Sequence, residues 1–146
     1  MQKTVHAEAI IPAPPEAVFA CLADYKCAPI FIEGLEELSP TGARTTGEKA
    51  QFQAVLKVGP HTLRTTISIT HLDPGRSVTW SSTGETAQSL HFELRPGPAG
   101  TGVALTVSYE EPGGLGAIFL APFVASAVQH RTEGALSRIR EHLVPS

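Results

Sequence analysis

The chain has 146 residues, of which 42% are hydrophobic and 17% are charged, and its formal net charge is −3. This composition excludes an intrinsically disordered chain and predicts one folded domain over residues 1–146. Because the net charge is negative and Lys and Arg form no run, we expect no nucleic-acid partner. The N-terminus lacks the apolar core of a signal peptide, and Pro122 interrupts the longest uncharged run. We therefore expect a cytoplasmic protein with no integral membrane segment.

The chain opens with a predicted strand and two short helical segments. Apolar and polar side chains alternate from Val5 to Ile11, which predicts a strand with one face inward. Pro14-Pro15-Glu16 suits the first turn of a helix, because proline loses no hydrogen bond there, and we expect this helix to end near Asp24. The apolar stretch from Tyr25 to Gly34 is interrupted by Pro29 and predicts a short second helix or cap packed on a sheet.

The middle of the chain has an apolar period of two, which predicts about six further strands. Gly- and Pro-rich turns separate the alternating runs, which cover residues 35–38, 50–58, 63–69, 78–82, 90–94 and 103–109. Each run has one apolar and one polar face, so we predict an antiparallel sheet with a single buried face.

A long helix is predicted from Leu115 to Val144, and it must cover the sheet because a one-faced sheet needs a partner layer. The expected fold class is therefore α+β. After Pro122 the apolar stripe consists of Val124, Val128, Ala135, Leu136, Ile139 and Leu143, whereas the first half is rich in small residues: Gly116, Ala117, Ala121, Ala125, Ser126 and Ala127. Small side chains facing a concave sheet can leave a cavity with a candidate gate at 115–127, or can simply let the helix pack closely.

Three stretches resemble segments of a known family. They are Val5–Phe19, with Pro12-Ala13-Pro14-Pro15-Glu16-Ala17-Val18-Phe19; Leu22-Ala23-Asp24-Tyr25 followed by Pro29-Ile30-Phe31-Ile32-Glu33-Gly34; and the turn Leu72-Asp73-Pro74-Gly75-Arg76. The family is the SRPBCC or START-like superfamily, and its polyketide cyclase/dehydrase and lipid-transport branch is the most similar. The resemblance covers essentially the whole chain. It implies a helix-grip fold, in which a curved antiparallel β-sheet of about six to seven strands wraps a long C-terminal helix, with two short helices after the first strand.

The resemblance also implies a cavity between sheet and C-terminal helix that takes a hydrophobic small molecule. We expect the ligand-binding residues to be Phe52, Thr65, Ile67, Ile69, Trp80, Phe92, Leu105, Tyr109, Phe119, Phe123, Ala127 and Arg131. The apolar members of this set could equally be ordinary core. The polar residues at inward-facing strand positions are Thr65, His71, Ser82 and Tyr109.

No catalytic residue can be assigned, but four polar side chains are candidates: Tyr109, Arg131, His71 and His130. Arg131 could bind a ligand carboxylate bidentately, or its stem could pack on the sheet with the charged head in water. His71 immediately precedes a turn, which favours exposure to solvent.

The sequence contains no GxSxG, P-loop, GxGxxG or HExxH motif, so we expect no cofactor. Cys21 and Cys27 match no zinc or redox spacing, and the six histidines are scattered. We therefore expect free thiols and no metal.

The sequence and the family resemblance are compatible with three functions. The first is binding or transport of a lipid, quinone or polyketide-like compound. The second is catalysis of the cyclase, aromatase or dehydratase kind in the same cavity, which leaves open whether the protein is an enzyme. The third is a protein-interaction module that docks through Ile30-Phe31-Ile32.

Overall fold

The computed structural model of the protein describes residues 2–32, 34–58, 61–83, 88–110 and 115–144. The side chains of residues 2, 58, 61, 63, 83, 110 and 115–128 lie outside this description. In chain order the elements are β1 (Gln2–Ile11), α1 (Pro15–Ala23), the 3₁₀ helix η1 (Tyr25–Cys27), α2 (Ala28–Phe31), β2 (Leu35–Pro40), β3 (Gln51–Val58), β4 (His61–Asp73), β5 (Ser77–Thr83), β6 (Gln88–Gly97), β7 (Gly100–Glu110) and α3 (Leu115–Leu143).

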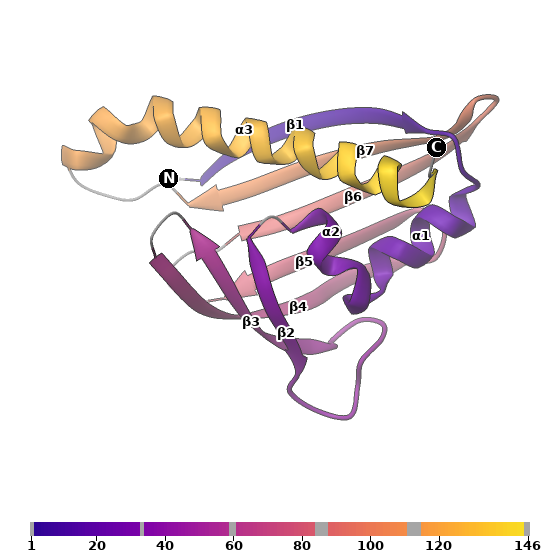
Figure 1. Ribbon diagram of the computed structural model, residues 1–146, viewed down its shortest axis with the longest axis horizontal. Helices are drawn as coiled ribbons and strands as arrows, with labels where there is room; N and C mark the ends of the chain where they lie inside the picture. The colour runs from indigo at the N-terminus through magenta and orange to yellow at the C-terminus, as the bar shows by residue number, and fades with distance from the viewer. Residues whose placement is uncertain (1, 33, 59–60, 84–87, 111–114, 145–146) are drawn as a thin grey trace.

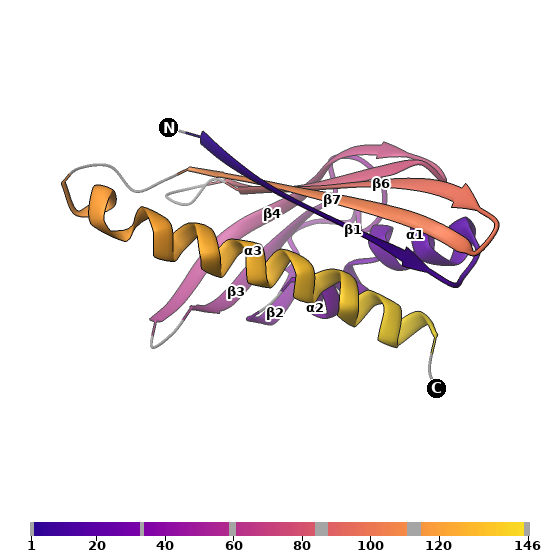
Figure 2. The ribbon, with the colours of Figure 1, turned by 90° about the horizontal axis from the view of Figure 1, so that it is seen from above.

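The strands form one seven-stranded antiparallel sheet in the order β1-β7-β6-β5-β4-β3-β2. Strands β2 to β7 are neighbours in chain order, and β1 pairs with β7 at the far edge (Figure 1). Helix α3 runs along one face of the sheet, as Figure 2 shows from above. The predicted α+β helix-grip fold is thus confirmed, with two short helices between β1 and β2. In the described part of the chain, no helix is long and apolar enough to cross a membrane.

Two glycines let loops approach neighbouring strands closely. Gly100, at φ +130°, begins β7 where β1 ends, and a Cβ there would collide with the carbonyl oxygen of Ile11. Gly34, at φ +84°, lies between α2 and β2, and a Cβ there would lie 2.5 Å from the carbonyl oxygen of Lys57. Only glycine adopts such angles at low cost and leaves this space free.

Aromatic side chains fill the concave face of the sheet at the end covered by η1 and α2. The ring of Tyr25 stacks on Phe52 at a centroid distance of 5.0 Å, and Phe52 lies 5.8 Å from Trp80. Phe31 lies 6.0 Å from Trp80 and meets Phe92 edge-on at 5.4 Å. Burying each such side chain stabilises the fold by about 1.5–3 kcal/mol. This aromatic cluster therefore anchors the short helices to the sheet.

The second half of α3 packs one face against the core. Its buried residues, Thr132, Ala135, Leu136 and Ile139, recur at intervals of three and four, as one face of a helix requires. On the flank of this face, the Arg138 Nε–H donates a hydrogen bond to the Ile30 carbonyl oxygen over 2.7 Å. This bond joins α3 to α2.

Candidate functional site

A cavity of about 100 Å³ lies between the concave face of the sheet, α2 and α3. Its walls come from α2, β6, β7 and α3 and from the residue that follows α2. They consist of Phe31, Ile32, Gln88, Leu90, Leu105, Val107, Arg131, Thr132 and Ala135. Six of the nine are apolar, so the cavity is a predominantly hydrophobic site with a few polar groups.

Strand register brings the sheet residues of this wall together. Leu90 on β6 pairs directly with Val107 on β7, and Phe92 pairs with Leu105. Paired residues in an antiparallel sheet share a face, and that face is the one that α3 covers. Across the gap, Arg131, Thr132 and Ala135 occupy about one turn of α3.

Two of the predicted ligand-binding residues, Leu105 and Arg131, line the cavity. Arg131 is exposed yet forms part of the wall, which places it at the rim. The position of Arg131 is thus intermediate between the two expected alternatives, an inward-facing side chain and a charged head turned out to water. Sequence reasoning placed Arg131 on the buried stripe of the helix, but the buried position belongs to Thr132, which is 2% exposed.

Most of the predicted apolar wall is core beside the cavity. This group is buried and does not line the cavity: Phe52, Ile67, Ile69, Trp80 and Phe92. The reason is that Tyr25 and Phe31, delivered by η1 and α2, fill the concave surface in front of them. Their role in ligand binding stays a prediction. The side chains of Phe119, Phe123 and Ala127, and the candidate gate at 115–127, lie outside the described residues.

The other polar candidates are not part of the cavity wall. Tyr109 is buried, at 4% exposure, and is two residues beyond Val107 on the same face of β7. Thr65 is half-buried opposite Ala54. The Ser82 hydroxyl accepts the Gln88 backbone N–H over 3.0 Å and so joins the ends of β5 and β6. None of the three is among the residues that line the cavity.

His71 lies on the opposite face of the sheet from the cavity, although a strict alternation would turn it inward. A β-bulge between Ile69 and His71 reverses the alternation, so that His71 pairs with Thr79. The Thr79 hydroxyl is 2.6 Å from Nδ1 of His91, and the His71 and His91 rings are 6.5 Å apart. His71 therefore belongs to an outer-face cluster. His130 is exposed on α3 and does not line the cavity either.

Residues 2–144 match the protein family described as polyketide cyclase / dehydrase and lipid transport. The chain belongs to this family. No curated protein matches the chain. Among solved structures it is similar to TTHA0849 from Thermus thermophilus, with a TM-score of 0.81 and 23% identity over 97% of both chains.

Two further solved structures share the fold. Ara h 8.0201 has a TM-score of 0.72 and 14% identity over 100% of both chains. The di-domain ARO/CYC protein StfQ from the steffimycin biosynthetic pathway has a TM-score of 0.76 and 10% identity, over 98% of this chain and 51% of that one. At these identities the likeness shows the family's fold and carries no information on ligand or reaction.

Several cavity residues of this family member were missed by sequence reasoning, although signals for them existed. Leu90 and Val107 have the same inward alternation as Phe92 and Leu105. Thr132 stands three residues before Ala135 and four before Leu136, which is the spacing of one helical face. Because threonine is polar, Thr132 was not counted among the apolar residues of the helix stripe.

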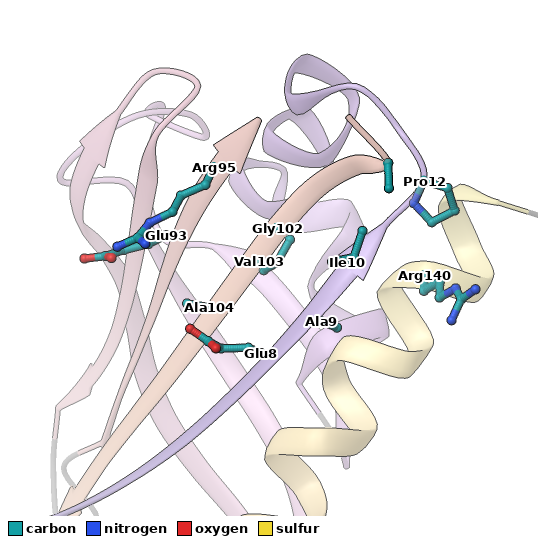
Figure 3. Close-up of a pocket in the computed structure, with 11 residues that line it drawn as sticks. Glu8, Ala9, Ile10, Pro12, Glu93, Arg95, Gly102, Val103, Ala104 and Arg140 are labelled. Carbon is teal, nitrogen blue, oxygen red and sulfur yellow. The ribbon is translucent and has the colours of Figure 1, made fainter. Parts of the chain in front are cut away.

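A larger hollow of about 800 Å³ opens on the protein surface near the ends of β1, β6 and β7 (Figure 3). It is wide and open to solvent, and Glu8, Glu93, Arg95 and Arg140 contribute charged side chains to its lining. An apolar ligand gains binding free energy when its surface is removed from water. A hollow that is open and charged removes little of that surface. The smaller cavity, which is less open to solvent and carries fewer charged side chains, is therefore the better candidate site.

One group of metal-ligating side chains comes together among the described residues, and none of its members lines the cavity. Its members are Cys21, Cys27 and His142. Both cysteines are free, Cys21 buried and Cys27 half-buried. Burial, helped by a hydrogen bond to Cys27, raises the pKa of the Cys21 thiol to about 12. The expectation of free thiols is met, whereas their proximity to a histidine was not foreseen.

Proposed function

We propose that the protein binds a hydrophobic small molecule in the cavity between the sheet and α3. The observation that carries this proposal is the wall itself, in which Phe31, Leu90, Leu105 and Val107 line a partly open space. Among the described residues of this wall, the polar side chains are those of Gln88, Arg131 and Thr132. An apolar site with few polar groups holds an apolar ligand and fixes its orientation.

The cavity's size narrows the ligand class. Drug-sized ligands occupy pockets of about 300–1,000 Å³, whereas an engineered cavity of about 150 Å³ holds benzene. The cavity of about 100 Å³ is smaller than that benzene-binding cavity, so it suits at most a single ring or a short aliphatic chain. A lipid, quinone or polyketide-like compound would need additional volume beside residues 115–128 of α3, whose side chains lie outside the description.

The wall chemistry favours binding over catalysis. Among the described residues that line the cavity there is no carboxylate, imidazole, thiol or phenol. Such groups carry general acid–base and nucleophilic chemistry in most enzymes. Phe31 is 3% exposed and packs on Trp80 and Phe92, so it is part of the core instead of a docking surface. Ligand binding is thus preferred to the cyclase and interaction-module hypotheses.

The experiment compares the binding of toluene and benzoate by isothermal titration calorimetry. Ala135 is buried in the cavity wall, so Ala135→Leu fills the space, and we expect affinity for both probes to fall by about tenfold or more. Ala20→Leu places the same side chain on an exposed position of α1 and serves as the matched control. Retention of binding by Ala135→Leu, or no binding of either probe to the parent protein, would overturn the proposal.

Arg131 provides a second comparison, because it tests whether the ligand carries an anionic group. Arg131→Met keeps most of the stem and removes the guanidinium. If the arginine recognises a carboxylate, benzoate affinity falls by about tenfold while toluene affinity is unchanged. Equal changes for both probes would show that Arg131 acts only as a wall.

A further inference from the structure

Three side chains from distant parts of the sequence converge where α3 ends beside α1. Cys21 lies in the last turn of α1, Cys27 ends η1, and His142 lies in the last turn of α3. Their ligand atoms, two sulfurs and one ring nitrogen, all lie within 4.8 Å of one another. Figure 1 shows the C-terminal end of α3 next to α1.

This spacing is close to that of a metal centre. Around a tetrahedral zinc ion two sulfurs are about 3.8 Å apart, and a sulfur and an imidazole nitrogen about 3.6 Å apart. Each pair of ligand atoms therefore needs to close by no more than about 1.2 Å. His142 is exposed on the final helical turn, and rotation of its side chain can supply that movement. Cys21 is fixed, because it is 4% exposed within the core.

The local charges favour a cation at this point. Cys21 and His142 lie in the last turns of two α-helices, the ends that carry partial negative charge, and Asp24 is the C-cap of α1. A thiol in such surroundings is a poor nucleophile, since reactive thiolates are stabilised by positive charge. A bound cation would instead favour the thiolate form, because the cation replaces the thiol protons.

We propose that Cys21, Cys27 and His142 bind one thiophilic metal ion, Zn²⁺ or Cu⁺. Thiolate and imidazole ligands select these ions over Mg²⁺ or Ca²⁺. On binding, each thiol releases its proton to solvent, and His142 coordinates through one neutral ring nitrogen. The two thiolates balance the charge of Zn²⁺. Solvent then completes a tetrahedral zinc site, whereas three ligands suffice for Cu⁺.

Such a site would join the end of α3 to α1 and η1 by bonds that the hydrophobic core does not supply. It is independent of the proposed ligand cavity, because His142 lies about 10 Å along the helix axis from Ala135. It departs from the expectation of no metal, which considered only spacing along the sequence. His142 follows Cys27 by more than a hundred residues.

The test uses the full chain, reduced and stripped of metal with a chelator, and then titrated separately with Zn²⁺, with Co²⁺ as a spectroscopic probe, and with Cu⁺ under anaerobic conditions. We expect one ion per chain, a rise in melting temperature, and a thiolate-to-Co²⁺ charge-transfer band. A larger rise with Zn²⁺ or with Cu⁺ identifies the preferred ion, and either result supports the proposal.

Variants separate the three-ligand site from chance binding. His142→Ala and Cys27→Ser should each weaken affinity by about tenfold or more, and Cys27→Ser should also reduce the charge-transfer band. His130→Ala removes another exposed histidine of α3, about 18 Å away, and should leave affinity unchanged. Because His142 is exposed, its loss does not threaten folding.

Three results would overturn the proposal. The first is the absence of stoichiometric binding by reduced protein of either Zn²⁺ or Cu⁺. The second is equal affinity of His142→Ala and the parent protein, which would leave at most a pair of thiols. The third is a Cys21–Cys27 disulfide that persists under reducing conditions, which mass spectrometry of the protein after reduction would detect.

Discussion

The indole Nε1–H of Trp80 donates a hydrogen bond to the backbone carbonyl oxygen of Leu22 over 2.8 Å. Trp80 lies in β5, and Leu22 lies in the last turn of α1, where helix carbonyls lack partners within the helix. The bond is buried and joins residues 58 positions apart. It therefore fixes the end of α1 on the sheet, and with it the neighbouring Cys21.

Trp80→Phe should lower the free energy of unfolding by about 1–3 kcal/mol, because it leaves the buried Leu22 carbonyl without a donor. The change is measured by urea unfolding. Phe92→Leu removes part of a neighbouring buried ring without touching a hydrogen bond, and so measures the packing loss alone. A Trp80→Phe protein as stable as the parent would show that the bond contributes nothing.

Phe31 separates the ligand cavity from the aromatic cluster, whereas Phe52 lies wholly within the cluster. Both Phe31→Leu and Phe52→Leu should cost about 1–2 kcal/mol of stability, because each leaves a small void. Only Phe31→Leu should alter ligand choice, by admitting a bulkier ring such as naphthalene. Calorimetric titration of both variants with naphthalene checks this difference. Equal naphthalene affinity of the two variants would show that the cavity is not bounded by Phe31.

Gly100→Ala should destabilise the protein by about 2 kcal/mol or more, since the new Cβ would collide with the Ile11 carbonyl oxygen at a positive φ. Gly97 lies in the same hairpin, and a Cβ there would meet only the Gly100 carbonyl oxygen at 3.8 Å. Gly97→Ala is therefore the matched control, and it should change stability by less than about 1 kcal/mol. Equal losses in urea unfolding would contradict the assigned role of Gly100.

In metal-free protein at pH 8, Cys27 should be alkylated by iodoacetamide well before Cys21. Only the thiolate reacts, and a pKa of about 12 leaves about one Cys21 in ten thousand ionised at that pH. Burial further restricts access to Cys21, which is 4% exposed. Peptide mapping by mass spectrometry over a time course measures both rates. In denaturant the two rates should converge, and similar rates in native protein would refute the prediction.

Local patterns predicted nearly all of the secondary structure, because strand alternation and turn residues are properties of neighbouring positions. The alternation of β6 and β7 placed Phe92 and Leu105 on the inner face without any knowledge of their partners. The same alternation failed at His71, where one bulged position reversed the face for the rest of β4. A bulge leaves no distinct signature in a single sequence.

The candidate site was only partly predictable. Inward alternation identifies residues that leave water, but it does not distinguish those that meet another side chain from those that border a cavity. That distinction depended on Tyr25 and Phe31, which reach the sheet from the short helical segments and fill one end of its concave face.

By itself, the sequence determined the order of the elements, the single buried face of the sheet and the helix that covers it, since each follows from periodicity over a few residues. Only the tertiary structure decided which part of that buried face borders a cavity. It alone also brought His142 to Cys21 and Cys27. The physical reason is that contacts between distant segments depend on how completed elements pack, and packing leaves no periodic trace along the chain.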